Sequence, residues 1–443
     1  MIFLILTFIF IPSVLLGKYI FKQWYNHLTL YTLIWYVMIS LYELKLLNYT
    51  DLNYRAWIAI GGAFLSFLFG SITIYFAKSA VDKNKLNFQY QKNEKLIFSD
   101  GGKVVKIFII ISSVIGLFAA LQNWYVLFKI YGSLSEIFLH GVEIYRLRVN
   151  GELQGITPYI ASFSYVGIFL SGLYSGYKNR ITMISFLPIF AVILKQLASF
   201  SRAGMLFALF LYGSAFFLYR YKSLYKVNTK KINLKLIFSS ISILILFIIA
   251  AGIIRTTRGT IESFSGASRK LESFRSGFLI TPSLYLYLSS DIGVLSKYLE
   301  KDFDNKIEFG EITFQPIYNI LSKFGFVKRV SYYDKGFFIP MWSNTATYIR
   351  YLYHDFGVSG IFIIPYFLAF FTSFFWYKFY EKGNVIYLIV LSYLFVLVLF
   401  SFLTIYSRQG NWFISLILLL FLTPIIKKIV SKNLTSKKYN NQF

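Results

Sequence analysis

Long apolar stretches recur along this chain and constrain its fold more than any other feature of the sequence. A helix needs about 20 mostly apolar residues to cross a bilayer. Eleven stretches approach or exceed that length, near 1–17, 28–47, 56–77, 104–128, 157–175, 181–198, 203–219, 236–254, 357–377, 385–404 and 411–426. We therefore predict an all-α polytopic membrane protein with about eleven, and between about ten and twelve, transmembrane helices.

The composition agrees with a membrane protein. The 443 residues are 57% hydrophobic and only 14% charged, which is typical of polytopic membrane chains. A net charge of +26 would favour nucleic-acid binding in a soluble protein. Here most lysines lie in short loops between apolar stretches, where topology and anionic lipid explain them. We expect membrane lipid, and no nucleic acid, as a partner. Cysteine is absent, which excludes disulfides and thiolate chemistry.

One polar segment, 255–355, separates the eighth apolar stretch from the ninth. The short loops on one predicted side of the membrane carry 23 lysines and arginines, against 6 on the other. The richer side is predicted to be cytoplasmic, so the segment lies outside. We predict eight helices in 1–254, a large, partly helical outer loop domain in 255–355, three helices in 356–430 and a cytoplasmic tail in 431–443.

Arginine is distributed unevenly between the two predicted sides. Of 13 arginines, only Arg180 and Arg220 lie on the cytoplasmic side. Topology does not explain this bias, because lysine and arginine count alike in the charge rule. The guanidinium group differs in its planar fork, which binds phosphate or carboxylate with two hydrogen bonds. The bias indicates an anionic ligand on the outer face, with pairing to outer acidic residues as the alternative.

Two predicted outer helix ends carry arginines suited to an anion. Arg202 follows Ser201, a candidate N-cap, and a helix N-terminus attracts anions; the alternative is that Arg202 reaches lipid headgroups. Arg255 and Arg258 stand three residues apart where the eighth stretch leaves the membrane. If the helix continues, both lie on one face. Two guanidinium groups side by side suit a pyrophosphate better than a single carboxylate.

The segment that leads into the ninth stretch carries titratable residues. We expect Asn344 to cap a helix on which Thr347, Arg350 and His354 share one face, with Asp355 beside them. An imidazole can act as a base near neutral pH, and the neighbouring carboxylate could hold its tautomer or act itself. The alternative for His354 is a purely structural role.

The outer loop 129–156 offers further candidates. Glu143 and Arg146 would be helix neighbours, so a local ion pair is the alternative to a catalytic role for Glu143. Asp302 and Asp304 are spaced like metal ligands but lie in a run of charges, and we expect no metal site. Further candidates for substrate binding are the outer arginines Arg146, Arg148, Arg269, Arg275 and Arg408.

Three segments carry the clearest similarity to a known family. They are SRAGMLFALFLYG at 201–213, FGEITFQPIYNILSKFG at 309–325 and SNTATYIRYLYHDFGVSGIF at 343–362. They resemble segments of bacterial O-antigen and oligosaccharide repeat-unit polymerases of the Wzy type. The order of apolar stretches, with one large outer loop late in the chain, resembles that family along nearly the whole sequence.

The resemblance implies a glycosyltransferase of GT-C-like architecture in the bacterial inner membrane, with its large loop in the periplasm. The implied reaction moves a growing glycan from undecaprenyl pyrophosphate to a hydroxyl of an incoming lipid-linked repeat unit, without a metal or other cofactor. The implied partners are these lipid-linked oligosaccharides, and a chain-length regulator and flippase of the same pathway.

The resemblance also implies roles for the candidate residues. The pyrophosphate would be bound by Arg202, Arg255, Arg258 and Arg350. His354 or Asp355 would be the base, with Glu143 in reserve; related O-antigen ligases use an outer-loop histidine near the corresponding span. Three alternatives stay open: an O-antigen ligase, a lipid-linked oligosaccharide flippase or other transporter, and a non-catalytic assembly factor. A flippase should show charges within its spans and two similar halves.

Overall fold

The protein is almost entirely helical in the computed structural model. The structure describes residues 2–81, 97–150, 152–153, 159–224, 234–257, 269, 273, 282–301, 307–330, 334–339 and 341–440. About 80% of the protein is helix. Sheet is confined, in these ranges, to one hairpin of two short strands. The predicted all-α fold class is therefore confirmed.

The chain divides into two compact units. Unit 1 is built from Met1–Leu86, Thr260–Phe374 and Leu397–Gln409. Unit 2 is built from Asn87–Gly259, Phe375–Val396 and Gly410–Phe443. Two helices near the C-terminus contribute to both units, because the divisions fall inside them. Most of the polar segment 255–355 thus belongs to the same unit as the first three helices.

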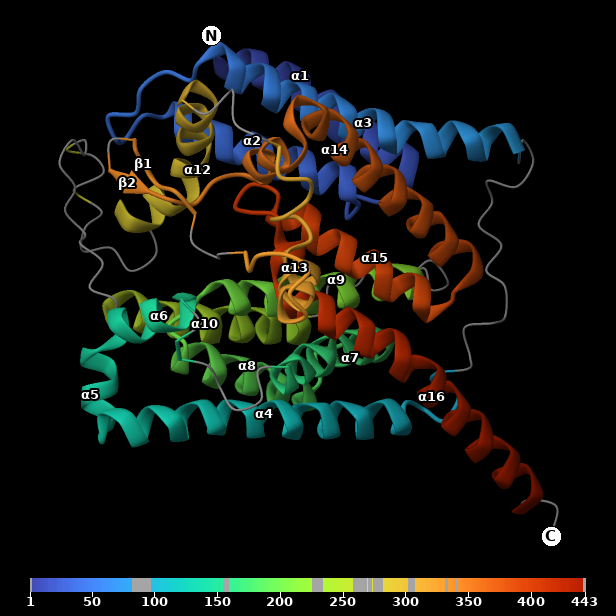
Figure 1. The fold of residues 1–443 in the computed structure, drawn as a ribbon. Coiled ribbons are helices and arrows are strands. Elements are labelled where there is room, and N and C mark those ends of the chain that lie inside the picture. Colours follow the sequence, from blue (N-terminus) through green and yellow to red (C-terminus); the bar gives the residue numbers. More distant parts are fainter. Residues whose placement is uncertain are drawn as a thin grey trace. The chain divides into compact units, whose positions relative to one another are not determined.

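Unit 1 contains helices and the hairpin. Its elements are α1 (Ile2–Phe21), α2 (His27–Glu43), α3 (Tyr54–Val81), α12 (Pro282–Lys301), α13 (Gln315–Lys323), β1 (Phe337–Phe338), β2 (Trp342–Ser343), the first part of α14 (Tyr348–Lys382) and the turn η4 (Tyr406–Arg408). The antiparallel strands pair Phe337 with Ser343 and Phe338 with Trp342. Helix α12 packs against α2 and α3 (Figure 1).

Aromatic side chains fill the interior of unit 1 between α2, α3 and the start of α14. The ring of Tyr31 stacks on that of Phe67, with 4.0 Å between centroids. The Tyr31 and Tyr348 hydroxyls are hydrogen-bonded at 2.8 Å. The Trp35 indole N–H donates to the Ser401 hydroxyl at 3.1 Å. Buried hydroxyl and indole groups need partners, so these bonds fix where α14 begins relative to α2.

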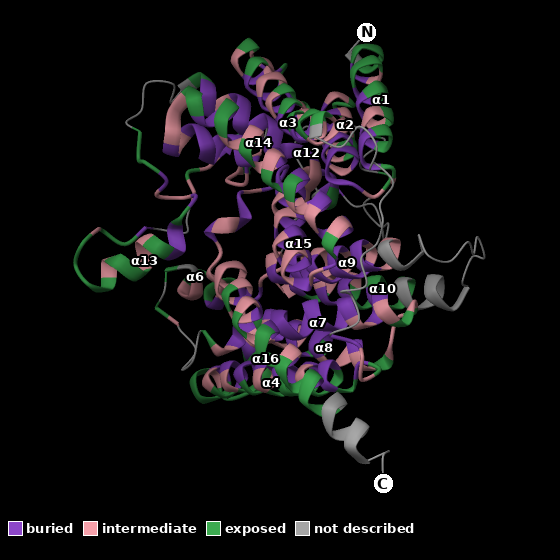
Figure 2. Ribbon diagram, turned by 90° about the vertical axis from the view of Figure 1, so that its right-hand side faces the viewer, coloured by how far each residue is buried: buried purple, intermediate pink, exposed green. Residues whose placement is uncertain are grey.

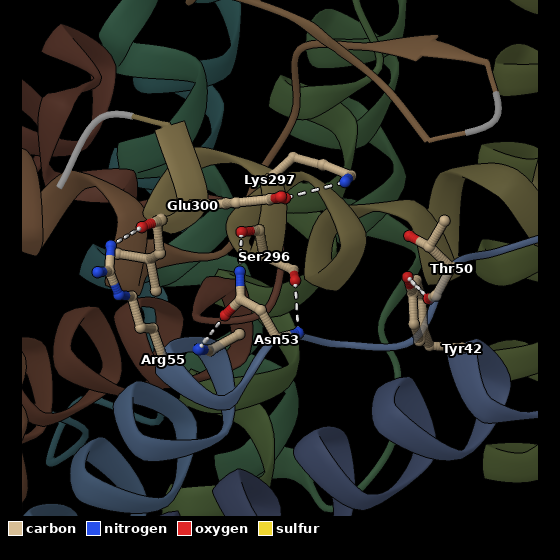
Figure 3. Close-up of polar contacts among 9 residues, drawn as sticks. Tyr42, Thr50, Asn53, Arg55, Ser296, Lys297 and Glu300 are labelled. Atoms are coloured by element: carbon tan, nitrogen blue, oxygen red, sulfur yellow. Dashed lines mark hydrogen bonds and ion pairs between the residues drawn. The ribbon is translucent and has the colours of Figure 1, made fainter.

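Asn53 attaches α12 to the N-terminal helices (Figure 3). Its side-chain oxygen accepts the N–H of Ala56 at 2.7 Å and so caps α3. Its own N–H donates to the Ser296 hydroxyl at 3.0 Å, and its amide group donates to the Ser296 carbonyl. The Arg55 guanidinium reaches the carbonyl of Leu299. One short polar linker thereby holds α12.

Unit 2 is helical throughout its described residues. Its elements are α4 (Lys103–Tyr131), α5 (Leu134–Leu139), α6 (Gly141–Asn150), η2 (Ile160–Ser162), α7 (Phe163–Lys178), η3 (Met183–Ser185), α8 (Phe186–Ala198), α9 (Ala203–Leu224), α10 (Leu234–Thr257), the rest of α14, most of α15 (Val385–Phe400) and α16 (Gly410–Asn440). Helices α4, α7, α8 and α9 lie side by side (Figure 1).

Helix α7 is the centre of unit 2, and most of its residues are buried (Figure 2). Two glycines four residues apart let it approach α9 closely. A side chain at Gly172 would meet the carbonyl oxygen of Tyr212 at 2.6 Å, and one at Gly176 would meet that of Phe216 at 2.9 Å. Small residues at this spacing allow helices to pack tightly where no water drives them together.

Each of the eleven apolar stretches overlaps one α-helix of the structure, and two of them, 157–175 and 181–198, also contain the short turns η2 and η3. Among the described residues, six helices are long and apolar enough to cross a membrane: α1, α3, α4, α9, α14 and α16. Shorter apolar helices lie at Met183–Ser199, Ile241–Ile254 and Val385–Phe400. The prediction of a helical membrane protein is confirmed at this level, by helix length and composition.

Helix α14 extends further toward the N-terminus than its apolar stretch. It begins at Tyr348, so Thr347 occupies the cap position and the predicted cap at Asn344 is wrong. The helix is interrupted at Gly357, whose φ of 65° and ψ of −153° are not helical. Glycine tolerates this conformation because it has no Cβ. The kink separates the polar first turns from the apolar remainder of the helix.

Candidate functional site

A hydrogen-bonded cluster in unit 1 is centred on Asp355. This carboxylate is fully buried. One oxygen accepts the N–H of Ile312 at 3.1 Å, and the other accepts both the N–H and the hydroxyl of Thr313 at 2.6 Å. The two segments singled out at 309–325 and 343–362 are therefore joined directly. With its oxygens occupied by three donors, Asp355 is better suited to positioning than to accepting a substrate proton.

His354 is the half-exposed member of this α14 cluster. Its side chain is 31% exposed, and Nδ1 lies 3.3 Å from a carboxylate oxygen of Asp355. When Nδ1 carries the proton that faces Asp355, Nε2 keeps its lone pair and can accept a proton. The sequence left the base open between the two residues. The geometry favours His354 as base and Asp355 as the group that orients it.

Two glutamates stand next to His354 in the turn that Asp355 holds. The N–H of Glu308 donates to the His354 carbonyl at 3.3 Å. Partial burial raises the pKa of Glu311, and repulsion from Glu308, together with a hydrogen bond between the two carboxyls, raises it further. The charge of His354 acts in the opposite direction. His354 therefore has two glutamates as acidic neighbours.

Arg350 is buried, and its guanidinium binds backbone carbonyls of unit 1. It is 5% exposed, and it donates to the backbone carbonyls of Lys335 at 2.8 Å and Asn344 at 3.3 Å. Its guanidinium carbon also lies 4.9 Å from the ring centre of Tyr298 and 5.6 Å from that of Phe337. These contacts hold the hairpin region to α14 and give no support to the predicted pyrophosphate contact.

Arg408 forms a buried ion pair with Asp334. Its Nη1 lies 2.8 Å from the carboxylate, and its Nε donates to the Gln315 side chain at 3.1 Å. The Tyr351 hydroxyl donates to the same Asp334 oxygen at 2.9 Å. Since Arg408 is only 3% exposed, the predicted contact with substrate has no support. Arg408 instead joins η4, α13 and α14.

Arg202 lies at the start of α9 in unit 2. The helix begins at Ala203, and the Arg202 carbonyl accepts the N–H groups of Met205 and Leu206. Arg202 itself therefore stands at the cap, and the prediction that Ser201 is the cap is wrong by one residue. The half-buried Arg202 side chain belongs to the positive end of the helix dipole, as an anion site requires.

Helix α6 carries three more candidates. Glu143 and Arg146 are exposed and lie one turn apart, so the predicted helical spacing is confirmed. Arg148 is half-buried, and its Nε is fully buried without a hydrogen-bond partner in the described part of the chain. Burial lowers the pKa of Arg148 to about 10. Burying a charged guanidinium group without a hydrogen-bond or charge partner costs folding free energy.

The remaining candidates are less well placed. Arg255 lies in the last turn of α10, where the structure describes its backbone and not its side chain. Arg269 is exposed in unit 1. Four residues singled out in the sequence lie outside the described residues altogether: Arg258, Arg275, Asp302 and Asp304.

We did not predict from the sequence that Thr313, Asp334 or Lys195 takes part in such contacts. Thr313 and Asp334 gave no local signal, because their partners Asp355 and Arg408 lie 42 and 74 residues away. Lys195 did give a signal. It is a charge within the apolar stretch 181–198, where charges are costly and usually functional.

Among the described residues, no group of three or more His, Asp and Glu side chains could hold a metal ion. No family model, curated protein or solved structure matches the chain.

Proposed function

We propose that this chain is a glycosyltransferase of the bacterial inner membrane that polymerises oligosaccharide repeat units, such as those of an O-antigen. It moves the growing glycan from undecaprenyl pyrophosphate to a hydroxyl of an incoming lipid-linked unit on the periplasmic side. The observation that carries the proposal is the pair of His354 and Asp355. It places a half-exposed imidazole on a buried carboxylate at the polar start of a long apolar helix.

The pair suits the proton transfer that this reaction needs. The acceptor hydroxyl attacks the anomeric carbon, a new C–O bond forms, and the bond from that carbon to the pyrophosphate oxygen breaks. The hydroxyl proton passes to Nε2 of His354, while Asp355 stabilises the resulting imidazolium. The leaving pyrophosphate takes the bonding electron pair and needs charge stabilisation rather than a proton.

The outer arginines supply the second requirement. Arg202 stands at the positive end of α9, and Arg255 stands in the last turn of α10. Both belong to unit 2, whereas His354 belongs to unit 1. Arg350 and Arg408 maintain the shape of unit 1.

The proposed architecture has eleven membrane-crossing helices of GT-C-like arrangement, with 255–355 in the periplasm and the tail in the cytoplasm. The proposed partners are the lipid-linked oligosaccharides, membrane lipid, and the flippase and chain-length regulator of the pathway. No metal or other cofactor enters the proposed reaction.

A deletion strain tests the proposal. Loss of a polymerase leaves single repeat units on the surface glycolipid, whereas loss of a ligase or a flippase leaves none. Complementation with the wild-type chain should restore the ladder of long chains, and complementation with His354→Gln should not. Normal long chains in the deletion strain would refute the polymerase assignment.

A further inference from the structure

Arg148 and Lys195 bring two positive charges together in unit 2. Arg148 lies in the last turn of α6, and Lys195 lies in the last turn of α8. The charge of Arg148 repels the Lys195 ammonium through space. In the part of the chain that the structure describes, no carboxylate offsets either charge. Two neighbouring cations without an acid destabilise a folded protein unless an anion joins them.

The packing of α6 explains how the two residues meet. A side chain at Gly141, the first residue of α6, would lie 3.0 Å from the ring of Phe200. Phe200 is fully buried in the turn between α8 and α9, and Ile144 is fully buried one turn into α6. The first residue of α6 thus packs on the α8–α9 turn, and Arg148, two turns further along α6, interacts electrostatically with Lys195 in the last turn of α8.

Tyr165 connects Lys195 to the N-terminus of α9. The Lys195 ammonium lies 5.6 Å from the centre of the Tyr165 ring. The Gln196 amide donates to the Tyr165 hydroxyl at 3.1 Å. A side chain at Gly204, in the first turn of α9, would lie 2.6 Å from that same hydroxyl. Lys195 and the positive end of the α9 dipole therefore both lie close to the same tyrosine.

We propose that Arg148 and Lys195 form a binding seat for the diphosphate group of a polyprenyl-linked substrate, next to the start of α9. The inference rests on the proposed function for the identity of the lipid, and it adds Lys195 to the arginines already considered. The guanidinium group supplies a two-pronged contact and the ammonium a point charge, which together match the two phosphoryl groups of a diphosphate.

Two positive charges that are held close together to bind an anionic ligand should lower the stability of the ligand-free protein. In the purified protein without ligand, Lys195→Met removes the repulsion and should leave the melting temperature equal or higher. The same variant should lose affinity for the anion. A lysine with a merely structural role would behave differently, because its replacement would lower the melting temperature.

The experiment measures binding of three probes to the purified full-length protein in detergent: undecaprenyl pyrophosphate, inorganic pyrophosphate and phosphatidylglycerol. Lys195→Met and Arg148→Gln should each lower the affinity for both pyrophosphate probes by about tenfold or more, since one charge-assisted contact is removed. Lys195→Arg, which keeps the charge, should bind within about threefold of wild type. Lys129→Met, an exposed lysine at the end of α4, is the matched control and should bind as wild type.

Each result decides the question. Unchanged pyrophosphate binding in both Lys195→Met and Arg148→Gln would overturn the seat, whatever the polymer assay shows. An equal loss of phosphatidylglycerol binding would identify a bilayer-headgroup site and overturn a diphosphate site. Loss of pyrophosphate binding together with normal long chains in the deletion strain would uphold the seat and refute only the polymerase assignment.

Discussion

Thr313 binds the carboxylate of Asp355 through both its backbone N–H and its hydroxyl, each at 2.6 Å, although 42 residues separate them. The contact fixes the turn at 309–314 to the first turns of α14. It also orients the carboxylate toward His354. One buried acid thereby holds the polar segment 255–355 to α14 and positions the candidate base.

Asp355→Asn should destabilise the protein more than Thr313→Val does. The new amide presents an N–H₂ group where backbone N–H groups already point, or leaves one of them unpaired, which costs about 1–3 kcal/mol. Thr313→Val removes only one hydroxyl contact and should cost about 1 kcal/mol. Thermal unfolding of both purified variants measures the difference. Equal stability in the two would contradict the central role of the carboxylate.

His354→Gln should abolish catalysis and preserve the fold. The amide can still donate toward Asp355, but it cannot accept the substrate proton near neutral pH. A missing general base typically lowers the rate about 10²- to 10⁴-fold. The measurement is polymer length in a complemented deletion strain, alongside protein abundance in the membrane. His140→Gln serves as the control, and comparable loss in that variant would remove the specific role of His354.

Arg202→Lys and Arg255→Lys keep the positive charge and remove the guanidinium fork. If two-pronged binding of pyrophosphate matters, long-chain polymer should be lost at normal protein abundance. The readout is the surface glycan ladder. Full activity in both variants would mean that charge alone suffices.

Arg408 and Asp334 should behave as a coupled buried pair. Arg408→Met leaves the Asp334 carboxylate without its charge partner, and breaking a buried pair typically costs about 3–5 kcal/mol. The double variant Arg408→Met with Asp334→Leu removes both charges and should recover most of that loss. Unfolding of the single and double variants forms a double-mutant cycle. Additive effects would show that the pair is not coupled.

Asp291 should make unit 1 less stable as the pH rises. Burial raises the pKa of this α12 carboxyl well above its ordinary value, and the nearby Thr345 hydroxyl offsets the rise only in part. Neither carboxyl oxygen has a hydrogen bond of good geometry among the described residues. Because the folded pKa exceeds the unfolded value, the proton stabilises the native state. That contribution is complete below the unfolded pKa and is lost as the pH rises toward the folded pKa.

Asp291→Asn tests this expectation, because the amide stays neutral at every pH. The variant should be more stable than wild type at neutral pH. The advantage should shrink as the pH falls from neutral toward about 4, the ordinary pKa of a free aspartate, and should be absent below it. Melting temperatures across the pH range provide the measurement. A variant that is less stable than wild type at neutral pH would contradict a buried, protonated Asp291.

The sequence by itself determined the fold class and the positions of the helices. Hydrophobic runs of sufficient length leave the backbone little choice in a bilayer, so the helices match all eleven apolar stretches. It also singled out 309–325 and 343–362, and the i, i+3 spacing of Glu143 and Arg146. The two segments were singled out by their resemblance to a known family, whereas the spacing of Glu143 and Arg146 follows directly from helix periodicity.

The tertiary structure decided which of the charged residues face a partner inside the protein. Arg350 and Arg408 look like candidate ligand-binding arginines in the sequence, yet packing directs them to carbonyls, rings and Asp334. Lys195 and Arg148 lie in different helices, and their charges interact because α6 packs near the end of α8. Electrostatic energy depends on distance and burial, and these follow from how helices distant in sequence pack together.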